Sequence, residues 1–189
     1  MNTFTKNIVP EYTDHNEILL DSLYSSPEVG LNLEFGVFNG RTINLCSEKR
    51  PERLFYGFDS FEGLPEDWRE DYLKGHFSLN GNLPRVNSNV SLIKGFFSET
   101  LDKFLIENNQ KISFLHIDCD LYSSTKYVLE KLKDRFFTGS IIIFDEFYNY
   151  PGWEQGEYKA WQEFVSLYSI NYEYIGYNIN HEQVALRIK

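Results

Sequence analysis

Residues 112–120 have the sequence Ile-Ser-Phe-Leu-His-Ile-Asp-Cys-Asp, an apolar run that ends in two aspartates. Such a nearly continuous apolar run is typical of a strand covered on both faces, as in a parallel sheet. A helical pattern follows over 123–136, and a second apolar strand at 140–144 leads directly into Asp145 and Glu146. This strand–helix–strand unit predicts two neighbouring strands that carry carboxylates at the same end.

The same alternation continues on both sides of this unit. Further strands are predicted at 31–35, 54–58, 90–93, 172–177 and 183–188. Further helices are predicted at 18–24, 41–48, 98–105 and 156–168. Ser98 is expected to cap one of these helices, and Ser123 or Ser124 to cap the helix after the central strand. Strands that alternate with helices predict an α/β fold, with a parallel sheet and helices on both of its faces.

Composition limits the partners and the compartment. The chain has 18 Lys and Arg against 28 Asp and Glu, a formal net charge of −10. Because an acidic surface repels phosphate groups and the basic residues do not cluster, we expect no nucleic acid and no membrane as a partner. No apolar run approaches the ~20 residues of a membrane-spanning helix. Residues 1–10 lack the apolar core of a signal peptide. Cys46 and Cys119 are expected to stay reduced, so the sequence predicts a cytoplasmic protein.

The 189 residues contain no repeat and no linker, so they predict one domain, 1–189. Its first part, 1–29, is predicted to be an N-terminal helical segment. Over 62–88 the composition changes to Gly, Pro, Asn and charged residues with scattered aromatics. Loops longer than about 12–15 residues are usually functional or mobile. We therefore expect segment 62–88 to be a lid over a substrate.

Four carboxylates are expected to converge at one edge of the sheet. Asp118 and Asp120 follow the central strand, where residues two apart share a face, and Asp145 and Glu146 follow the next strand. Clustered like charges need a cation or shared protons, and a hard, oxygen-preferring ion such as Mg²⁺ suits them. The alternative is that some of them are helix caps or solvated carboxylates. His116, inside the strand, is expected to be a core histidine bonded to backbone.

Small and acidic residues follow the first two strands as well. Gly36 and Gly40 follow strand 31–35, where glycines let a ligand approach the backbone at a helix N-terminus. The pattern lacks the third glycine of the dinucleotide fingerprint, so a nicotinamide cofactor is not favoured. Asp59 ends the second strand, at a position suited to accept the hydroxyls of an adenosine ribose. The alternative for Asp59 is a turn cap.

Several stretches, in the same order along the chain, resemble the macrocin O-methyltransferase family: 33–37, 57–65, 94–101, 118–125 and 144–160. Members of this family are class I S-adenosylmethionine (SAM) enzymes that methylate hydroxyls, often on the sugars of natural products, with Mg²⁺. The resemblance implies a Rossmann-like class I methyltransferase fold. Its sheet would be mostly parallel and seven-stranded, with helices on both faces and an antiparallel last strand. The implied activity is Mg²⁺-assisted transfer of a methyl group from SAM to a hydroxyl of a sugar or glycosylated natural product.

The resemblance also implies roles for individual residues. The positions that match the family's SAM site, from the methionine end through the ribose to the adenine, are Glu34, Gly36, Gly40, Asp59, Ser60, Phe61, Gly95 and Phe96. Asp118, Asp145 and Glu146 match the metal ligands, and Asp120 matches the general base. The family is usually longer at its N-terminus, so a second subunit that completes the acceptor site, and hence a homodimer, is one expectation.

Two other functions stay open from the sequence. Asp118 and Asp120 also form a D-x-D motif, of the kind that holds a metal and a nucleotide-sugar diphosphate in a glycosyltransferase. A non-catalytic SAM-binding module is the second. In the favoured interpretation the partner is a small-molecule acceptor with a sugar or glycoside hydroxyl.

Overall fold

The central strand forms where the apolar run predicts it, and all of its residues are buried. The computed structural model describes residues 9–189, so the first eight residues of the predicted segment 1–29 lie outside the described residues. The strands are β1 Glu11–Tyr12, β2 Leu31–Phe35, β3 Phe55–Asp59, β4 Val90–Lys94, β5 Ile112–Ile117, β6 Ile141–Phe144, β7 Tyr172–Asn178 and β8 Val184–Ile188. The α-helices are α1 His15–Tyr24, α2 Arg41–Lys49, α3 Phe97–Glu107, α4 Tyr122–Leu132 and α5 Glu157–Tyr168. Short 3₁₀ turns lie at Lys133–Arg135 and Trp153–Gln155.

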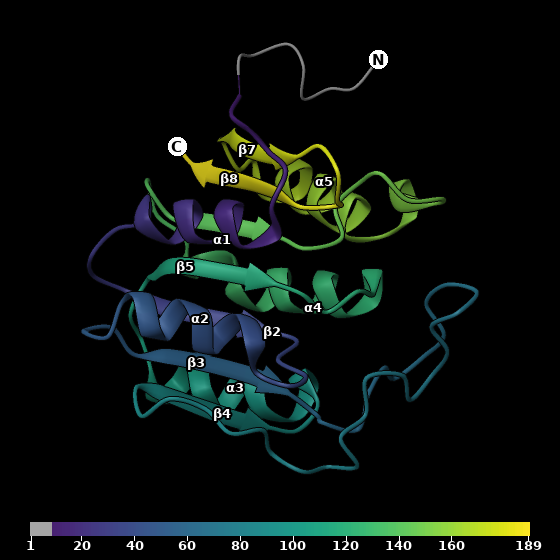
Figure 1. Cartoon of the computed structure of the whole chain (residues 1–189). Helices are drawn as coiled ribbons and strands as arrows, with labels where there is room; N and C mark the ends of the chain where they lie inside the picture. Colours follow the sequence, from purple (N-terminus) through teal and green to yellow (C-terminus); the bar gives the residue numbers. More distant parts are fainter. Residues whose placement is uncertain (1–8) are drawn as a thin grey trace.

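The strands form one sheet in the order β1-β7-β8-β6-β5-β2-β3-β4. The five strands from β4 to β6 are parallel, and β8 runs antiparallel to both β6 and β7. The predicted α/β fold, with its mostly parallel sheet and antiparallel last strand, is confirmed. The carboxyl ends of β2, β3, β5 and β6 therefore meet at one edge (Figure 1).

The strand count differs from the prediction by one, because the sheet has eight strands. The additional strand is the two-residue β1, which pairs in parallel with β7 at the edge of the sheet. It is held by the backbone bonds from Tyr177 N to Pro10 O (3.2 Å) and from Ile179 N to Tyr12 O (2.8 Å). A strand this short has no periodic pattern, so its sequence could not reveal it.

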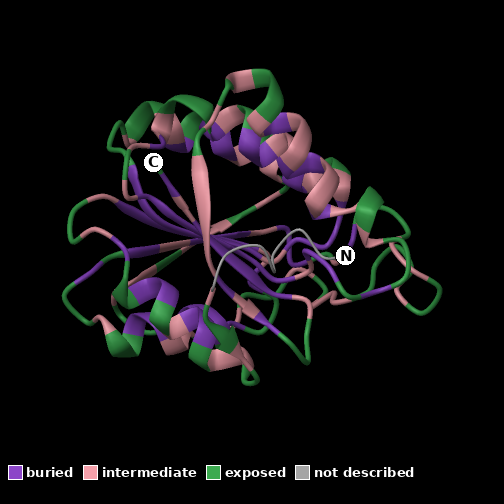
Figure 2. Ribbon diagram, turned by 90° about the horizontal axis from the view of Figure 1, so that it is seen from above, coloured by how far each residue is buried: buried purple, intermediate pink, exposed green. Residues whose placement is uncertain are grey.

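Helices cover both faces of the sheet, as Figure 2 shows with the buried strands between two helical layers. One apolar cluster lies under α3, α4 and α5, and it includes Phe104, Leu129 and Trp161. The other lies under α1 and α2, and it includes Leu19 and Ile43. The two layers hold the sheet rigidly, which fixes the strand ends.

Two predicted helix caps are wrong. Ser98 and Ser123 both lie inside their helices, and the N-cap residues are Phe96 for α3 and Leu121 for α4. The Ser123 hydroxyl instead donates a hydrogen bond to the Glu66 carboxylate in segment 62–88. A serine near a helix start thus serves a tertiary contact here, which local sequence does not distinguish from a cap.

Segment 62–88 has no helix or regular strand and extends beyond the end of β3 (Figure 1). It is tied down by backbone bonds, because Leu79 N and Gly81 N both donate to Phe61 O, at 3.0 and 2.9 Å. Cys46 and Cys119 are buried free cysteines. Among the described residues no helix is both long and apolar enough to cross a membrane.

Candidate active site

A cavity of about 1110 Å³ opens at the edge where the parallel strands end. Many of the residues predicted for the site line it: Gly36, Asp59, Ser60, Phe96, Asp118, Asp120, Asp145 and Glu146. The other predicted residues are not among those that line the cavity: Glu34, Gly40, Phe61 and Gly95. The cofactor-side residues and the four carboxylates therefore border one space.

Gly36 lies where the turn after β2 packs against the turn after β5. Its φ of +92° is in the left-handed region, and a Cβ at this position would lie 1.6 Å from the backbone oxygen of Asp118. The Asp118 N–H donates to Phe35 O (2.9 Å), and the Gly36 N–H donates to Phe58 O (3.0 Å). Only a glycine allows the turn after β2 to pack this closely against the turn after β5.

Asp59 anchors the turn that follows β2. Its Oδ2 accepts from the backbone N–H groups of Val37 (2.9 Å) and Phe38 (2.8 Å), and its Oδ1 accepts from Phe61 N–H (2.7 Å). Asp59 therefore does act as a turn cap, the alternative that the sequence left open. Because a carboxylate offers about four acceptor positions, these three bonds leave capacity for a ligand hydroxyl in the cavity. The ribose role stays a prediction.

Glu34 and His116 form a buried pair beneath the cavity. The Glu34 carboxylate accepts from the Thr42 hydroxyl (2.9 Å), and its other oxygen lies 3.0 Å from His116 Nδ1. The expectation that His116 bonds to backbone is wrong, because its ring lies between Glu34 and Asp145, whose Oδ1 is 3.6 Å from Nε2. A carboxylate on each side raises the pKa of His116 well above its usual value, although burial opposes this.

The four carboxylates do converge. Oxygens of Asp118, Asp120 and Glu146 lie within 4.8 Å of one another, and ligand atoms of His116, Asp118 and Asp145 form a second, overlapping group. Asp118 belongs to both groups. The geometry thus offers a compact oxygen site with Asp120 in it, and a neighbouring site in which a histidine accompanies Asp145.

The direction of the Asp120 side chain is set by a turn and not by the pleat of a strand. Strand β5 ends at Ile117, and Asp120 has a φ of +64° while Leu121 N donates to Cys119 O at 2.6 Å. This i→i+2 turn is strained for a residue with a side chain, and strain of this kind is found at functional sites. Cys119, between the two aspartates, turns its side chain into the core, where its Sγ lies 3.4 Å from Thr125 Oγ1.

The carboxylates differ in their electrostatics. Burial and the charge of Asp145 raise the pKa of Asp120 to about 7, and they raise the pKa of Asp118 and Glu146 well above their usual values. Burial would also raise the pKa of Asp145, but the nearby rings of His116 and His15 outweigh it and lower that pKa. The negative charge is therefore favoured on Asp145 and disfavoured on Asp118, Asp120 and Glu146. A bound cation would offset the unfavourable free energy of ionising these three carboxyl groups.

Glu146 gives the clearest sign of a missing partner. Its Oε2 is buried and makes no hydrogen bond to any described residue. Buried polar atoms are nearly always satisfied, so an orphaned oxygen at a cluster of oxygens fits a hard cation such as Mg²⁺. Asp118 and Glu146, two of the three predicted ligands, therefore fit such an ion, whereas the third, Asp145, groups with His116 and Asp118.

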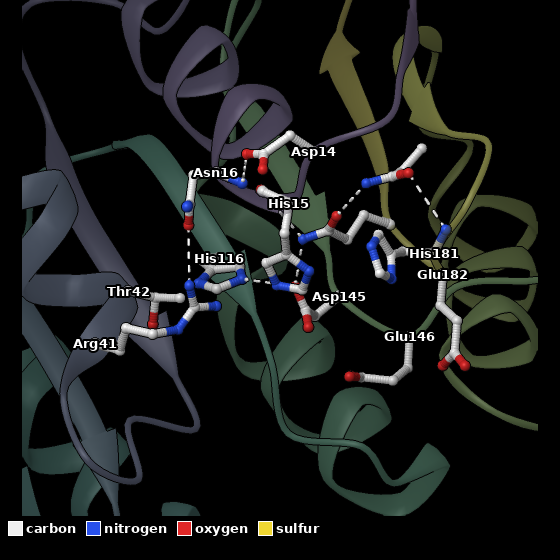
Figure 3. Close-up of polar contacts among 12 residues, drawn as sticks. Asp14, His15, Asn16, Arg41, Thr42, His116, Asp145, Glu146, His181 and Glu182 are labelled. Carbon is white, nitrogen blue, oxygen red and sulfur yellow. Dashed lines mark hydrogen bonds and ion pairs between the residues drawn. The ribbon is translucent and has the colours of Figure 1, made fainter.

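Two features of the cavity were missed by sequence reasoning. His15, the first residue of α1, has its Nε2 3.1 Å from Asp145 Oδ1 and faces it in Figure 3. Arg69 donates two hydrogen bonds to the Glu182 carboxylate, from Nη1 to Oε1 (3.1 Å) and from Nη2 to Oε2 (2.7 Å). Its guanidinium also lies over Trp68, 3.6 Å from the ring centre, and over Tyr150, 4.2 Å away. No local motif marks contacts between such distant parts of a chain.

The fold, with a cavity at its strand ends, is that of the class I methyltransferases. Residues 29–181 match the family model described as Macrocin-O-methyltransferase (TylF). The chain belongs to this family and is a SAM-dependent O-methyltransferase. No curated protein sequence gives a significant match.

Solved structures agree with this assignment. The calicheamicin methyltransferase CalS11 has a TM-score of 0.72 and 27% identity, over 90% of this chain and 76% of that chain. Its apo structure, described as a TDP-rhamnose 3′-O-methyltransferase, has a TM-score of 0.62 and 26% identity over the same shares of 90% and 76%. The mycinamycin-pathway methyltransferase MycE, in complex with Mg and SAH, has a TM-score of 0.57 and 13% identity, over 92% of this chain and 48% of that chain. At this identity MycE supports the fold alone.

Proposed function

We propose that the chain transfers the methyl group of SAM to a sugar hydroxyl, in a nucleotide sugar or a glycosylated natural product, with the help of Mg²⁺. The observation that carries this proposal is the convergence of Asp118, Asp120, Asp145 and Glu146 in one cavity with the glycine turn and Asp59. This arrangement suits methyl transfer, because an oxygen nucleophile must meet the sulfonium methyl group in line and at near-attack distance.

On the cofactor side, Gly36, Asp59, Ser60 and Phe96 would contact SAM directly, since they line the cavity. The other positions that match the family's SAM site do not line the cavity and would act indirectly: Glu34, Gly40, Phe61 and Gly95. Glu34, for example, holds Thr42 at the start of α2, whose N-terminus faces the cavity. The methionine end of SAM would therefore lie against the turn after β2 and the helix behind it.

On the acceptor side, Asp118, Asp145 and Glu146 are the proposed ligands of Mg²⁺, from the family positions and the orphaned oxygen of Glu146. In the structure, Asp118 lies in both oxygen-rich groups, while Glu146 groups with Asp120 and Asp145 groups with His116. When bound, the ion would lower the pKa of an acceptor hydroxyl and fix its direction. Asp120 is the proposed general base: its carboxylate would take the hydroxyl proton while the oxygen takes the methyl group and S-adenosylhomocysteine (SAH) leaves. The strained turn at Asp120 supports a role that requires a fixed side chain.

The roof of the cavity suits a sugar. Trp68, Tyr72 and Phe77, from segment 62–88, line the cavity and present flat apolar faces beside polar side chains. The volume of about 1110 Å³ exceeds that of most single-ligand pockets, so it has room for SAM and an acceptor together. CalS11, described as acting on TDP-rhamnose, supports a nucleotide sugar as the first acceptor to test. We also propose that segment 62–88 is the lid.

The family assignment leaves the glycosyltransferase and the non-catalytic module without support. The predictions of a cytoplasmic location and of a homodimer rest on the sequence alone. The acceptor is best identified by a screen with labelled SAM against nucleotide sugars and deoxysugar glycosides, each with and without Mg²⁺. The proposal predicts label in a sugar ether with Mg²⁺ present. Label found only on the aglycones of the glycosides, and on no sugar hydroxyl, would contradict the proposed substrate class.

A further inference from the structure

Helix α1 precedes the residues that match the family model, which begin at residue 29, yet it reaches the active site. Its position is well fixed. The Asp14 carboxylate caps it by accepting from the N–H groups of Asn16 (2.8 Å) and Glu17 (3.1 Å). Ile18 and Leu19 are fully buried against the sheet. His15, between the cap and these apolar residues, is therefore held in place at the cavity.

Three side-chain nitrogens gather around one oxygen of Asp145. Gln183 Nε2 donates to Oδ1 at 2.8 Å, His15 Nε2 lies 3.1 Å from it, and His116 Nε2 lies 3.6 Å from it. No described residue makes a hydrogen bond to the other oxygen, Oδ2. Oδ1 thus takes all of these contacts, and Oδ2 stays available to another partner.

We infer that His15 is a positioning residue of the active site, which holds Asp145 with Oδ2 directed at the proposed Mg²⁺ site. This inference rests on the proposed function, because it assigns Asp145 to the metal. Carboxylates that bind metals are commonly oriented by hydrogen bonds from outside the ligand set, and losing such a partner typically costs ~10–100-fold in metal affinity or activity.

The surroundings of His15 separate this role from a purely structural one. Its side chain is 28% exposed and lines the cavity, so the core does not require it. The helix is held by its cap and by its buried leucine and isoleucine side chains. His181 is a matched comparison, because it lines the same cavity and its ring meets that of His15 edge-on at 5.8 Å, yet no contact joins it to Asp145.

The test measures Mg²⁺ binding to the SAH-bound enzyme by calorimetry. His15→Ala is expected to weaken Mg²⁺ binding by about 10–100-fold, with SAH affinity unchanged. His15→Gln is expected to recover most of the loss, because a glutamine amide can donate from nearly the position of Nε2. His181→Gln is the control, with unchanged Mg²⁺ affinity. In rate measurements, His15→Ala should raise the Mg²⁺ concentration for half-maximal rate, and saturating Mg²⁺ should restore kcat.

Thermal unfolding of each variant shows whether it folds. If His15→Ala does not fold, the Mg²⁺ affinities of His15→Gln and His181→Gln are compared in its place. Equal Mg²⁺ affinity in the wild-type chain and in folded His15→Ala would overturn the role of His15 and leave the proposed function intact. A wild-type chain that binds no Mg²⁺ would overturn the proposed metal site, and this inference with it.

Discussion

The floor and the roof of the cavity are built in different ways. The floor consists of strand ends that carry deeply buried polar residues: Glu34 is 3% exposed, Asp145 is 8% exposed, and they lie on either side of His116. The roof is segment 62–88, in which even apolar residues such as Leu73 (58%) and Leu83 (55%) are exposed. The floor is thus held by buried contacts, and we expect the more exposed roof to adapt to an acceptor.

The largest expected effect lies in the floor, at Asp120. Asp120→Asn keeps the size and polarity of the side chain but removes its proton acceptor, so turnover should fall by roughly 10²–10⁴-fold while SAM and Mg²⁺ still bind. Asparagine tolerates a positive φ as well as aspartate does, so the turn at Asp120 should survive. Single-turnover rates together with calorimetry measure this split.

Because Asp120 lies in the same oxygen group as Asp118 and Glu146, it could be a metal ligand and not the base. If millimolar Mg²⁺ restores the rate of Asp120→Asn, then Asp120 is a metal ligand with Asp118 and Glu146, and the base lies elsewhere. His181, which lines the same cavity, would then be the residue to test as the base.

The next effect in size concerns the metal. Asp145→Ala should raise the Mg²⁺ concentration for half-maximal rate, with partial rescue by excess metal. The increase should be at least the ~10–100-fold that is typical when a residue that only orients a metal ligand is lost. The rate is measured against Mg²⁺ concentration at saturating SAM. A Mg²⁺ dependence identical to that of the wild type would remove Asp145 from the ligand set.

A smaller effect is expected at Asp59. Asp59→Ala should weaken SAM binding at least about tenfold, since the ribose hydroxyls lose a charged acceptor. It should also lower the free energy of unfolding by about 1–3 kcal/mol, because three backbone N–H groups lose their acceptor. Asp59→Asn separates the effects, as it keeps one acceptor oxygen for the turn. Calorimetry with unchanged SAM affinity in both variants would show that Asp59 is a turn cap alone.

The smallest effect is expected in the roof. Arg69→Gln removes the paired hydrogen bonds to Glu182 and the stacking on Trp68 and Tyr150, contacts worth about 0.5–1 kcal/mol each. The KM for the acceptor should rise several-fold while kcat and Mg²⁺ affinity stay unchanged. Hydrogen exchange over 68–88 should slow when SAH and acceptor bind, and it should be faster in Arg69→Gln before they bind. High protection without ligands would make the segment a fixed wall.

The same contrast explains what the sequence could predict. The apolar runs before Asp118 and Asp145 mark two buried strands, and parallel connection brings their ends together, so the floor follows from the pattern. Gly36 was found for the same reason, although its contact with the Asp118 backbone was not. The sequence gives no local sign of His15 or of the Arg69–Glu182 pair, because tertiary packing alone brings those residues to the cavity.

The central claim is that the carboxylates at the ends of β5 and β6 form a metal-assisted site of methyl transfer. The direct measurement is the rate of label transfer from SAM to a sugar acceptor in EDTA, followed by addition of Mg²⁺. The account predicts that the rate is lost in EDTA and returns with Mg²⁺. Full activity in EDTA would contradict it, and the carboxylate cluster would then be a proton-sharing base site without a metal.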